Sequence, residues 1–200
     1  MGRTILLGLT GSIGMGKTTV AGMFSDEGIP VFDADATVHR LQGPEGALVA
    51  DIEAHFPGTT GPSGVDRGAL AERVLGESAA LRRLEALIHP AVAREREAFL
   101  ARHREAPAVV LDIPLLFEKG GWRDVDRIAV VSAPAEIQRA RVLARPGMTE
   151  AKLAKILSHQ LPDVEKRARA DFVIPTGGDL STTRSAVREI IACLGSLPDS

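Results

Sequence analysis

Short apolar runs alternate with amphipathic stretches along most of this chain. Five runs are continuously apolar, which is typical of strands buried on both faces of a parallel sheet: Ile5 to Leu9, Ile29 to Phe32, Val109 to Ile113, Ile128 to Val131 and Phe172 to Ile174. Between the first two runs, Val20, Met23 and Phe24 fall on one face of a helix that Gly28 can close. The pattern predicts an α/β fold, with a five-stranded parallel sheet flanked by helices.

Residues 35–103 carry helical patterns and no strong strand. Breaks are expected at Gly43-Pro44, at 57–62 and at His89-Pro90, because proline disfavours helical backbone in the residue before it. This segment is predicted to be a mostly helical insertion.

A basic helix-turn-helix pattern runs from Ala135 to Leu161. It turns at Pro146-Gly147, and Thr149 is expected to cap its second helix. Such a segment can fold over phosphates, so we predict a lid over residues 139–161. A last helix is predicted from Ser181 to Leu194, with Val187, Ile190, Ile191 and Leu194 at core spacing, and residues 196–200 are expected to fray.

Residues 11–18 read G-x-x-x-x-G-K-T, directly between the first apolar run and the first helical pattern. The alternative is an ordinary glycine-rich turn. The flanking strand and helix disfavour it, because a chance match to the motif would not require either of them. Glycines let successive N–H groups face one phosphate cluster, and the helix that starts near Lys17 adds its positive dipole end. Lys17 can reach the β- and γ-phosphates, and the Thr18 hydroxyl can bind Mg²⁺. We therefore predict a site for ATP with Mg²⁺ formed by Gly11, Ser12, Ile13, Gly14, Met15, Gly16, Lys17, Thr18 and Thr19.

Composition agrees with a compact enzyme. The chain has 200 residues and 44% hydrophobic content, so one domain over residues 1–200 with insertions is expected. The 24 basic and 26 acidic side chains leave a net charge of −2, which disfavours a nucleic-acid binder. No apolar run approaches the roughly 20 residues that span a bilayer, so no membrane association is expected. Cys193 is the single cysteine and cannot form an internal disulfide, which suits a reducing cytoplasm. Its side chain is expected to fill the core. Nothing in the sequence indicates an obligate protein partner.

Polar residues directly after apolar runs are the strongest further candidates, because ligands of an open parallel sheet bind beyond the carboxyl ends of its strands. Asp33 follows the second run and is the candidate general base. Its carboxylate is expected to face the γ-phosphate if its strand neighbours the first strand, which leads into residues 11–18, the P-loop. The alternative is that Asp33 or Asp35 only caps the next helix. Asp112 follows the third run and is a candidate Mg²⁺ ligand, with a turn carboxylate as its alternative.

The lid pattern also offers cations for the transferred phosphoryl group. Arg141 and Arg145 are i,i+4 neighbours on one face and are predicted to contact phosphate, whereas Arg139 is assigned to a solvated face. The five histidines show no metal-binding spacing. His39 can face an acceptor, and His89 is either an acceptor contact or a helix-boundary residue.

Over nearly its whole length the chain resembles the dephospho-coenzyme A kinases. The resemblance rests on Gly8 to Thr19, Asp33-Ala34-Asp35, Leu87-Ile88-His89-Pro90, Pro114 to Glu118, Gln138 to Arg145, Gln160 and Ala170 to Ile174. It implies MgATP-dependent phosphorylation of the ribose 3′-hydroxyl of dephospho-CoA, the last step of CoA synthesis. It further implies that Asp33, Lys17 and Arg141 are catalytic, that Arg145 binds ATP, and that the insertion and the 114–118 loop bind the acceptor through Asp33, Asp35, His39, His89, Pro114, Leu115 and Leu116.

The chain departs from the family pattern at a few positions. The family commonly has Gly at position 12 and Ser at positions 15 and 18, where this chain has Ser12, Met15 and Thr18. It often has an Asn after the final strand, where this chain reads Pro175-Thr176-Gly177-Gly178. Without the resemblance, the residues indicate only a small-molecule kinase. The alternatives are another P-loop kinase, acting on a nucleoside monophosphate or a hydroxy acid, and a non-catalytic nucleotide switch.

Overall fold

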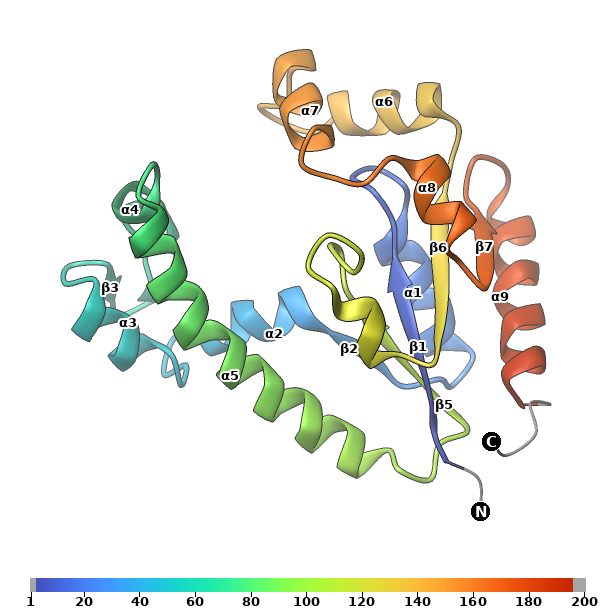
Figure 1. The fold of residues 1–200 in the computed structure, drawn as a ribbon, viewed down its shortest axis with the longest axis horizontal. Coiled ribbons are helices and arrows are strands. Elements are labelled where there is room, and N and C mark those ends of the chain that lie inside the picture. The colour runs from blue at the N-terminus through green and yellow to red at the C-terminus, as the bar shows by residue number, and fades with distance from the viewer. Residues whose placement is uncertain (1–2, 196–200) are drawn as a thin grey trace. The chain divides into compact units, whose positions relative to one another are not determined.

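The computed structural model describes residues 3–195, which divide into two compact units. One unit consists of residues 3–32 and 103–195, and the other of Asp33–Arg102. The expected fraying of residues 196–200 lies outside the described residues. Figure 1 shows the elements, which in chain order are β1 (Ile5–Thr10), α1 (Lys17–Asp26), β2 (Val31–Asp33), α2 (Ala34–Leu41), α3 (Val49–His55), β3 (Thr60–Gly61), β4 (Gly64–Val65), α4 (Arg67–Val74), α5 (Ser78–Arg102), β5 (Ala108–Asp112), a 3₁₀ turn (Gly121–Asp124), β6 (Arg127–Ser132), α6 (Ala135–Leu143), α7 (Glu150–Leu157), α8 (Asp163–Ala168), β7 (Phe172–Pro175) and α9 (Leu180–Gly195).

The central sheet has the strand order β2-β5-β1-β6-β7, so β5 separates β2 from the P-loop strand β1, and the neighbouring of these two strands considered for Asp33 is not found. Its strands run parallel, with Leu9 opposite Asp112 and Ser132 opposite Pro175, so the predicted five-stranded parallel sheet is confirmed. Carboxyl ends of parallel strands lie at one edge of a sheet. The P-loop after β1, Asp112 at the end of β5 and the segment after β7 are therefore neighbours at that edge.

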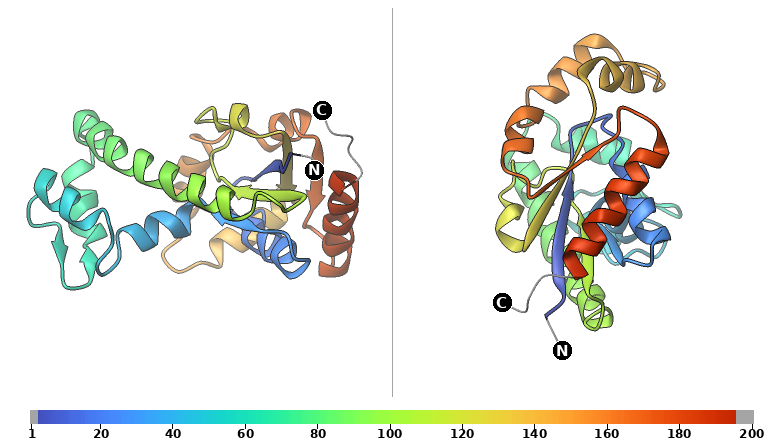
Figure 2. Two further views of the ribbon diagram at one scale, coloured as in Figure 1. Left: turned by 90° about the horizontal axis from the view of Figure 1, so that it is seen from below. Right: turned by 90° about the vertical axis from the view of Figure 1, so that its right-hand side faces the viewer.

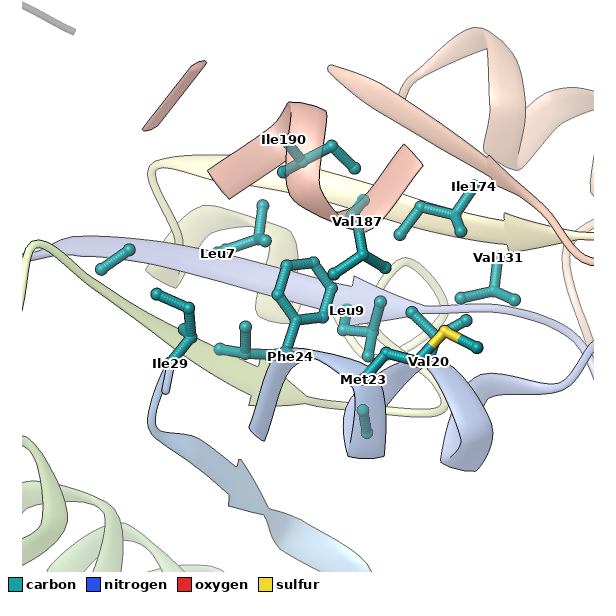
Figure 3. Close-up of a cluster of buried hydrophobic side chains, with 14 of the residues drawn as sticks. Leu7, Leu9, Val20, Met23, Phe24, Ile29, Val131, Ile174, Val187 and Ile190 are labelled. Atoms are coloured by element: carbon teal, nitrogen blue, oxygen red, sulfur yellow. The ribbon is translucent and has the colours of Figure 1, made fainter. Parts of the chain in front are cut away.

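Helices cover both faces of the sheet. On one face, α1 and α9 pack against the side chains of Leu7 and Leu9, and Phe24 of α1 is fully buried between the helices and the sheet (Figure 3). On the opposite face, Ile128 and Val130 pack against Leu116 and its neighbours. Figure 2 shows α9 and the 161–171 segment on opposite sides of β1. Successive strand residues point to opposite faces, so burial on both faces explains why the strands are continuously apolar.

The helix break expected at His89-Pro90 is wrong, because α5 runs from Ser78 to Arg102 with Pro90 inside it. Proline in a helix interior costs about 3 kcal/mol. Burial of an apolar stripe that continues across the proline offsets this cost. The stripe is formed by Leu84, Leu87, Ile88, Ala91 and Val92. These residues pack with Leu41, Ile52 and Phe56 in the core of the Asp33–Arg102 unit, and this tertiary packing overrides the local signal.

The same unit contains a small antiparallel hairpin, β3 with β4, in a segment expected to be loop. Gly64 has a φ of 90°, and a Cβ there would lie 2.3 Å from the Gln42 carbonyl oxygen, so only glycine fits. The Glu53 carboxylate accepts hydrogen bonds from the Gly58 N–H (2.8 Å) and the Thr60 hydroxyl (2.7 Å). These side-chain contacts hold a hairpin too short to show a strand pattern.

The last helix agrees with its prediction except at Cys193. Val187, Ile190 and Leu194 are buried against the sheet, whereas Cys193 is exposed, so its expected place in the core is wrong. It lies beside the apolar stripe rather than on it. Among the helices of residues 3–195, none has a stretch apolar and long enough to pass through a bilayer.

Candidate active site

The P-loop connects the end of β1 to the start of α1 at Lys17. Gly14 and Gly16 have φ angles of 77° and 89°, in the left-handed region that favours glycine. Gly14 is also confined in space, since a Cβ there would lie 2.5 Å from Val142 Cγ2 and 3.0 Å from the Gln138 carbonyl oxygen. The loop therefore packs directly against α6, and any side chain at position 14 would push the two apart.

Lys17 forms an ion pair with Asp112 at the carboxyl edge of the sheet. The Asp112 side chain is 3% exposed and that of Lys17 17%, so both charges are largely shielded from water. Thr18 and Thr19 are exposed in the first turn of α1. The structure thus brings together the predicted phosphate cation and the predicted metal-binding carboxylate. No group of three or more His, Cys, Asp and Glu in residues 3–195 is arranged to hold a metal ion.

The lid helices α6 and α7 lie beyond the carboxyl ends of β1 and β6 (Figure 1). Arg141 of α6 donates a hydrogen bond to the Thr176 carbonyl oxygen at 2.6 Å, and its Nη1 would lie 3.7 Å from a Cβ at Gly16. This guanidinium therefore lies at the P-loop, as phosphate contact requires. Arg145 is exposed and lies just beyond the end of α6 at Leu143, so the prediction that Arg141 and Arg145 share one helix face is wrong. Arg139 pairs with Glu150, and both side chains are more than half exposed, which agrees with its assignment to a solvated face.

Thr176 stands where the family often has Asn, and its side chain is almost fully buried. Its hydroxyl lies 2.6 Å from the Met15 carbonyl oxygen and 3.2 Å from that of Ser132. The main chain of Thr176 accepts the hydrogen bond from Arg141. This residue therefore connects the P-loop, the end of β6 and the lid arginine, a role that no sequence motif indicated.

Several residues of the predicted ATP site are held by contacts within the protein. The side chains of Ser12 and Met15 are buried, and Met15 Sδ accepts a hydrogen bond from the Ala133 N–H at 3.1 Å. The N–H of Ile13 donates to Gln160 Oε1 at 3.1 Å, and its carbonyl accepts from Gln138 Nε2 at 2.7 Å. The polar groups of Ile13 thus bind lid residues, so in this structure its N–H is not aimed at a phosphate.

The candidate acceptor residues of the Asp33–Arg102 unit lie at the start of α2, on α2 and on α5. Asp33 ends β2 and caps α2, where its Oδ1 accepts a hydrogen bond from the Ala36 N–H at 2.8 Å. Asp35 lies in the first turn of α2 and is not the cap. His39, one turn later, contacts Arg67 of α4, and His89 is exposed on α5. The alternative considered for Asp33, helix capping, is therefore real, and it engages one carboxylate oxygen.

Residues of the loop after β5 differ in how far they are buried. Pro114 and Leu115 are partly exposed, but Leu116 is fully buried against β1 and β6, and the acceptor contacts predicted for this loop stay predictions. The loop is held by the Thr10 hydroxyl, which donates to the Pro114 carbonyl at 3.2 Å. Leu116, the middle residue of the 114–118 loop, thus belongs to a small apolar core.

Glu118 closes this loop onto a fully buried lysine, Lys166 of α8, with 2.9 Å between Oε1 and Nζ. The same oxygen accepts from the Leu161 N–H at 2.8 Å. Burial by itself raises the pKa of Glu118, but the adjacent Lys166 ammonium and the hydrogen bond from the Leu161 N–H outweigh it and hold the pKa below its usual range. Because an isolated buried ammonium is very unfavourable, this pair fixes the end of the lid segment to the loop after β5.

With this arrangement established, comparison with known proteins is informative. A sequence model of the family described as dephospho-CoA kinase matches residues 5–181. The chain belongs to the dephospho-CoA kinase family. It is 62% identical over 194 residues to the dephospho-CoA kinase of Novosphingobium aromaticivorans, covering 97% of this chain and 96% of that one.

Solved structures give the same fold. TT1252 from Thermus thermophilus superimposes with a TM-score of 0.84 at 37% identity, covering 96% of this chain and 98% of that one. Dephospho-CoA kinase from Campylobacter jejuni superimposes with a TM-score of 0.67 at 22% identity and similar coverage, 96% and 97%, which supports the fold alone. The dephospho-CoA kinase family match includes the P-loop, the Asp33–Arg102 unit and the lid, so these three parts fall within the family's domain.

Proposed function

We propose that this protein transfers the γ-phosphoryl group of ATP to the ribose 3′-hydroxyl of dephospho-CoA, which forms CoA and ADP. The observation that carries the proposal is the position of Lys17, Asp112 and Arg141 around one P-loop, in a chain of the dephospho-CoA kinase family. Phosphoryl transfer depends mainly on orientation and on charge stabilisation, and these side chains supply both. A purely structural P-loop domain has no need of a lid guanidinium beside Gly16.

In this proposal each residue acts at a defined atom. The acceptor oxygen forms a bond to the γ-phosphorus while the bond between that phosphorus and the β,γ-bridging oxygen breaks, and ADP leaves. Lys17 neutralises the β- and γ-phosphate oxygens, and Arg141 stabilises charge on the transferred group. The Asp33 carboxylate takes the proton of the attacking hydroxyl. In the Asp33–Arg102 unit, Asp35, His39 and His89 are proposed to bind the acceptor.

The residues at the P-loop also fit Mg²⁺. A buried carboxylate, Asp112, and an exposed hydroxyl, Thr18, are hard oxygen donors of the type that Mg²⁺ accepts beside phosphates and water. When bound, Mg²⁺ would neutralise charge on the β- and γ-phosphate oxygens. Asp112 would exchange part of its contact with Lys17 for this ion, directly or through water.

A coupled assay of ADP formation tests the proposal, with MgATP and one acceptor at a time. Dephospho-CoA should give turnover, and mass spectrometry should find one added phosphate on its ribose. AMP and shikimate represent the nucleoside monophosphate and hydroxy-acid acceptors, and neither should be phosphorylated. Turnover with one of them but not with dephospho-CoA would contradict the proposed acceptor, whereas ATP hydrolysis that ignores every acceptor would favour a nucleotide switch.

A further inference from the structure

The lid begins and ends at the same residue of the P-loop. Gln138 lies on α6, the first lid helix, and Gln160 lies in the turn that follows α7, the second. Gln138 Nε2 donates to the Ile13 carbonyl at 2.7 Å, and Gln160 Oε1 accepts from the Ile13 N–H at 3.1 Å. Two side chains separated by most of the lid thus satisfy both polar groups of one residue.

These contacts have a defined direction. An amide side chain can donate from nitrogen or accept at oxygen. At Ile13 the carbonyl requires the donor from Gln138, and the N–H requires the acceptor from Gln160. Gln138 is only 7% exposed, so the loss of its hydrogen bond would leave a shielded carbonyl without that donor.

Packing next to Ile13 points to the same connection. Gly14 lies so close to α6 that a Cβ would meet both Val142 and the main chain of Gln138. On the other side, the Leu161 N–H next to Gln160 binds Glu118, which pairs with the buried Lys166. The base of the lid is therefore held against the P-loop at one end and against the loop after β5 at the other.

We propose that Gln138 and Gln160 are positioning residues, which fix the lid to the P-loop through the two polar groups of Ile13. Because Arg141 lies one turn beyond Gln138 on α6, this attachment sets where its guanidinium meets the phosphates. The attachment also holds the P-loop main chain before Gly14, so the phosphate cradle and the lid arginine are aligned together. The inference rests on the proposed kinase function and adds two residues that act without touching substrate.

Glutamate substitutions separate this role from a general effect of charge. Gln160→Glu keeps an acceptor for the Ile13 N–H, but Gln138→Glu places an oxygen against the Ile13 carbonyl. We expect kcat to fall by about 10-fold or more in Gln138→Glu and by less than about 3-fold in Gln160→Glu. The KM for dephospho-CoA should change little in both. Methionine, which has nearly the same shape but no donor and only a weak sulfur acceptor, should lower kcat at both positions, so that Glu rescues position 160 only.

Glu150→Gln is the matched control, since it changes one lid charge and removes only the exposed pair with Arg139. Its kcat should stay within about 2-fold of wild type. Thermal unfolding of every variant checks that the fold is intact. Equal losses in Gln138→Glu and Gln160→Glu, or wild-type kcat in Gln138→Met, would overturn the proposal.

Amide hydrogen exchange at Ile13, followed by NMR in the protein without substrates, tests the contact independently of the acceptor. Exchange should be about 10-fold faster or more in Gln160→Met and close to wild type in Gln160→Glu. Unchanged exchange in Gln160→Met would contradict the attachment even if the enzyme is active. A wild-type protein that fails to phosphorylate dephospho-CoA would instead contradict the proposed function, and the exchange rates would still decide the role of Gln160.

Discussion

The hydroxyl of Thr176 lies 2.6 Å from the Met15 carbonyl oxygen, and this hydrogen bond joins the segment after the last strand to the P-loop. The Met15 carbonyl must point away from bound phosphates if neighbouring N–H groups are to point toward them. The side chain of Thr176 is almost fully buried and is directed at the loop itself.

Thr176→Val should therefore weaken ATP binding while it preserves side-chain shape. The unsatisfied Met15 carbonyl should cost about 1–3 kcal/mol, seen as a lower melting temperature and a higher KM for ATP. Thr176→Ser keeps the hydroxyl and serves as the control. If valine and serine gave the same KM and melting temperature, the hydrogen bond to Met15 would have no role in holding the loop.

Lys17→Ala should abolish most turnover, because it removes the cation expected at the β- and γ-phosphates and leaves buried Asp112 without its ion pair. Thr18→Ala should also lower turnover, and raising the Mg²⁺ concentration should restore part of it, since a weaker metal site needs more ion. Circular dichroism should remain native. Wild-type turnover in purified Lys17→Ala would exclude the proposed phosphate cradle.

The arginines on α6 and just after it provide a comparison within the lid. Arg141→Ala should lower kcat more than it weakens ATP binding, because its guanidinium lies beside Gly16 and also holds the Thr176 carbonyl. Arg145→Ala should lower kcat if lid closure brings this exposed side chain to the phosphates. Arg139→Ala is the control, with an exposed pair worth about 0–1 kcal/mol. Stopped-flow measurement of single turnovers separates the rate of phosphoryl transfer from ATP binding. Equal transfer rates in all three variants would show that Arg141 and Arg145, like Arg139, belong to a solvated face of the lid.

The Glu118–Lys166 pair predicts an acid-sensitive lid attachment. Since the folded pKa of Glu118 is lowered, its stabilising contribution is complete above its ordinary pKa of about 4.3 and is lost as pH falls through the folded value. Glu118→Gln should lower stability by about 3–5 kcal/mol at neutral pH, because Lys166 stays buried without its partner. The difference from wild type should shrink as the solution is acidified below pH of about 4.

Urea unfolding at several pH values measures this effect. The double variant Glu118→Gln/Lys166→Met removes both charges and should recover most of the stability lost in Glu118→Gln. Arg188→Gln, which breaks an exposed pair with Glu27, should change stability by less than about 1 kcal/mol. A constant difference between wild type and Glu118→Gln from neutral pH to pH of about 3 would show that folding does not lower the pKa of Glu118.

Much of the fold follows from local patterns, and the exceptions have physical causes. The P-loop and its flanking strand and helix were predictable because glycine, lysine and hydroxyl chemistry are local requirements. Pro90 was misread because the apolar stripe that holds α5 together is formed with residues distant in the chain. The β3–β4 hairpin was missed because Glu53 and Gly64 stabilise it through contacts that leave no periodic pattern.

The site residues show the same difference between local patterns and contacts made across the chain. Lys17, Asp112 and Arg141 stand at positions that strand ends and helix spacing indicate. Gln138, Gln160 and Thr176 act on main-chain groups of the P-loop, and no side-chain motif marks a residue whose partner is a peptide group. The resemblance assigns Leu116 to the acceptor, but its side chain is fully buried against Ile128 and Val130.

Asp33 remains the decisive test of the mechanism, because the structure shows the role that competes with catalysis. Its Oδ1 caps α2 through the Ala36 N–H, which is enough to explain an aspartate at a helix start. Asparagine caps a helix about as well as aspartate, but it has no charge and accepts no proton. A cap alone therefore predicts that Asp33→Asn keeps its activity.

A general base predicts the opposite. Asp33→Asn should fold and bind MgATP almost as wild type does, while kcat with dephospho-CoA drops by about 10²–10⁴, the usual contribution of a positioned base. Asp66→Asn is the matched control, since Asp66 caps α4 in the same way, with its Oδ1 accepting from the Ala69 N–H at 3.0 Å. Melting temperatures of the two variants should be similar to each other. If kcat in Asp33→Asn equals that in Asp66→Asn, Asp33 is a helix cap and the base must be sought elsewhere.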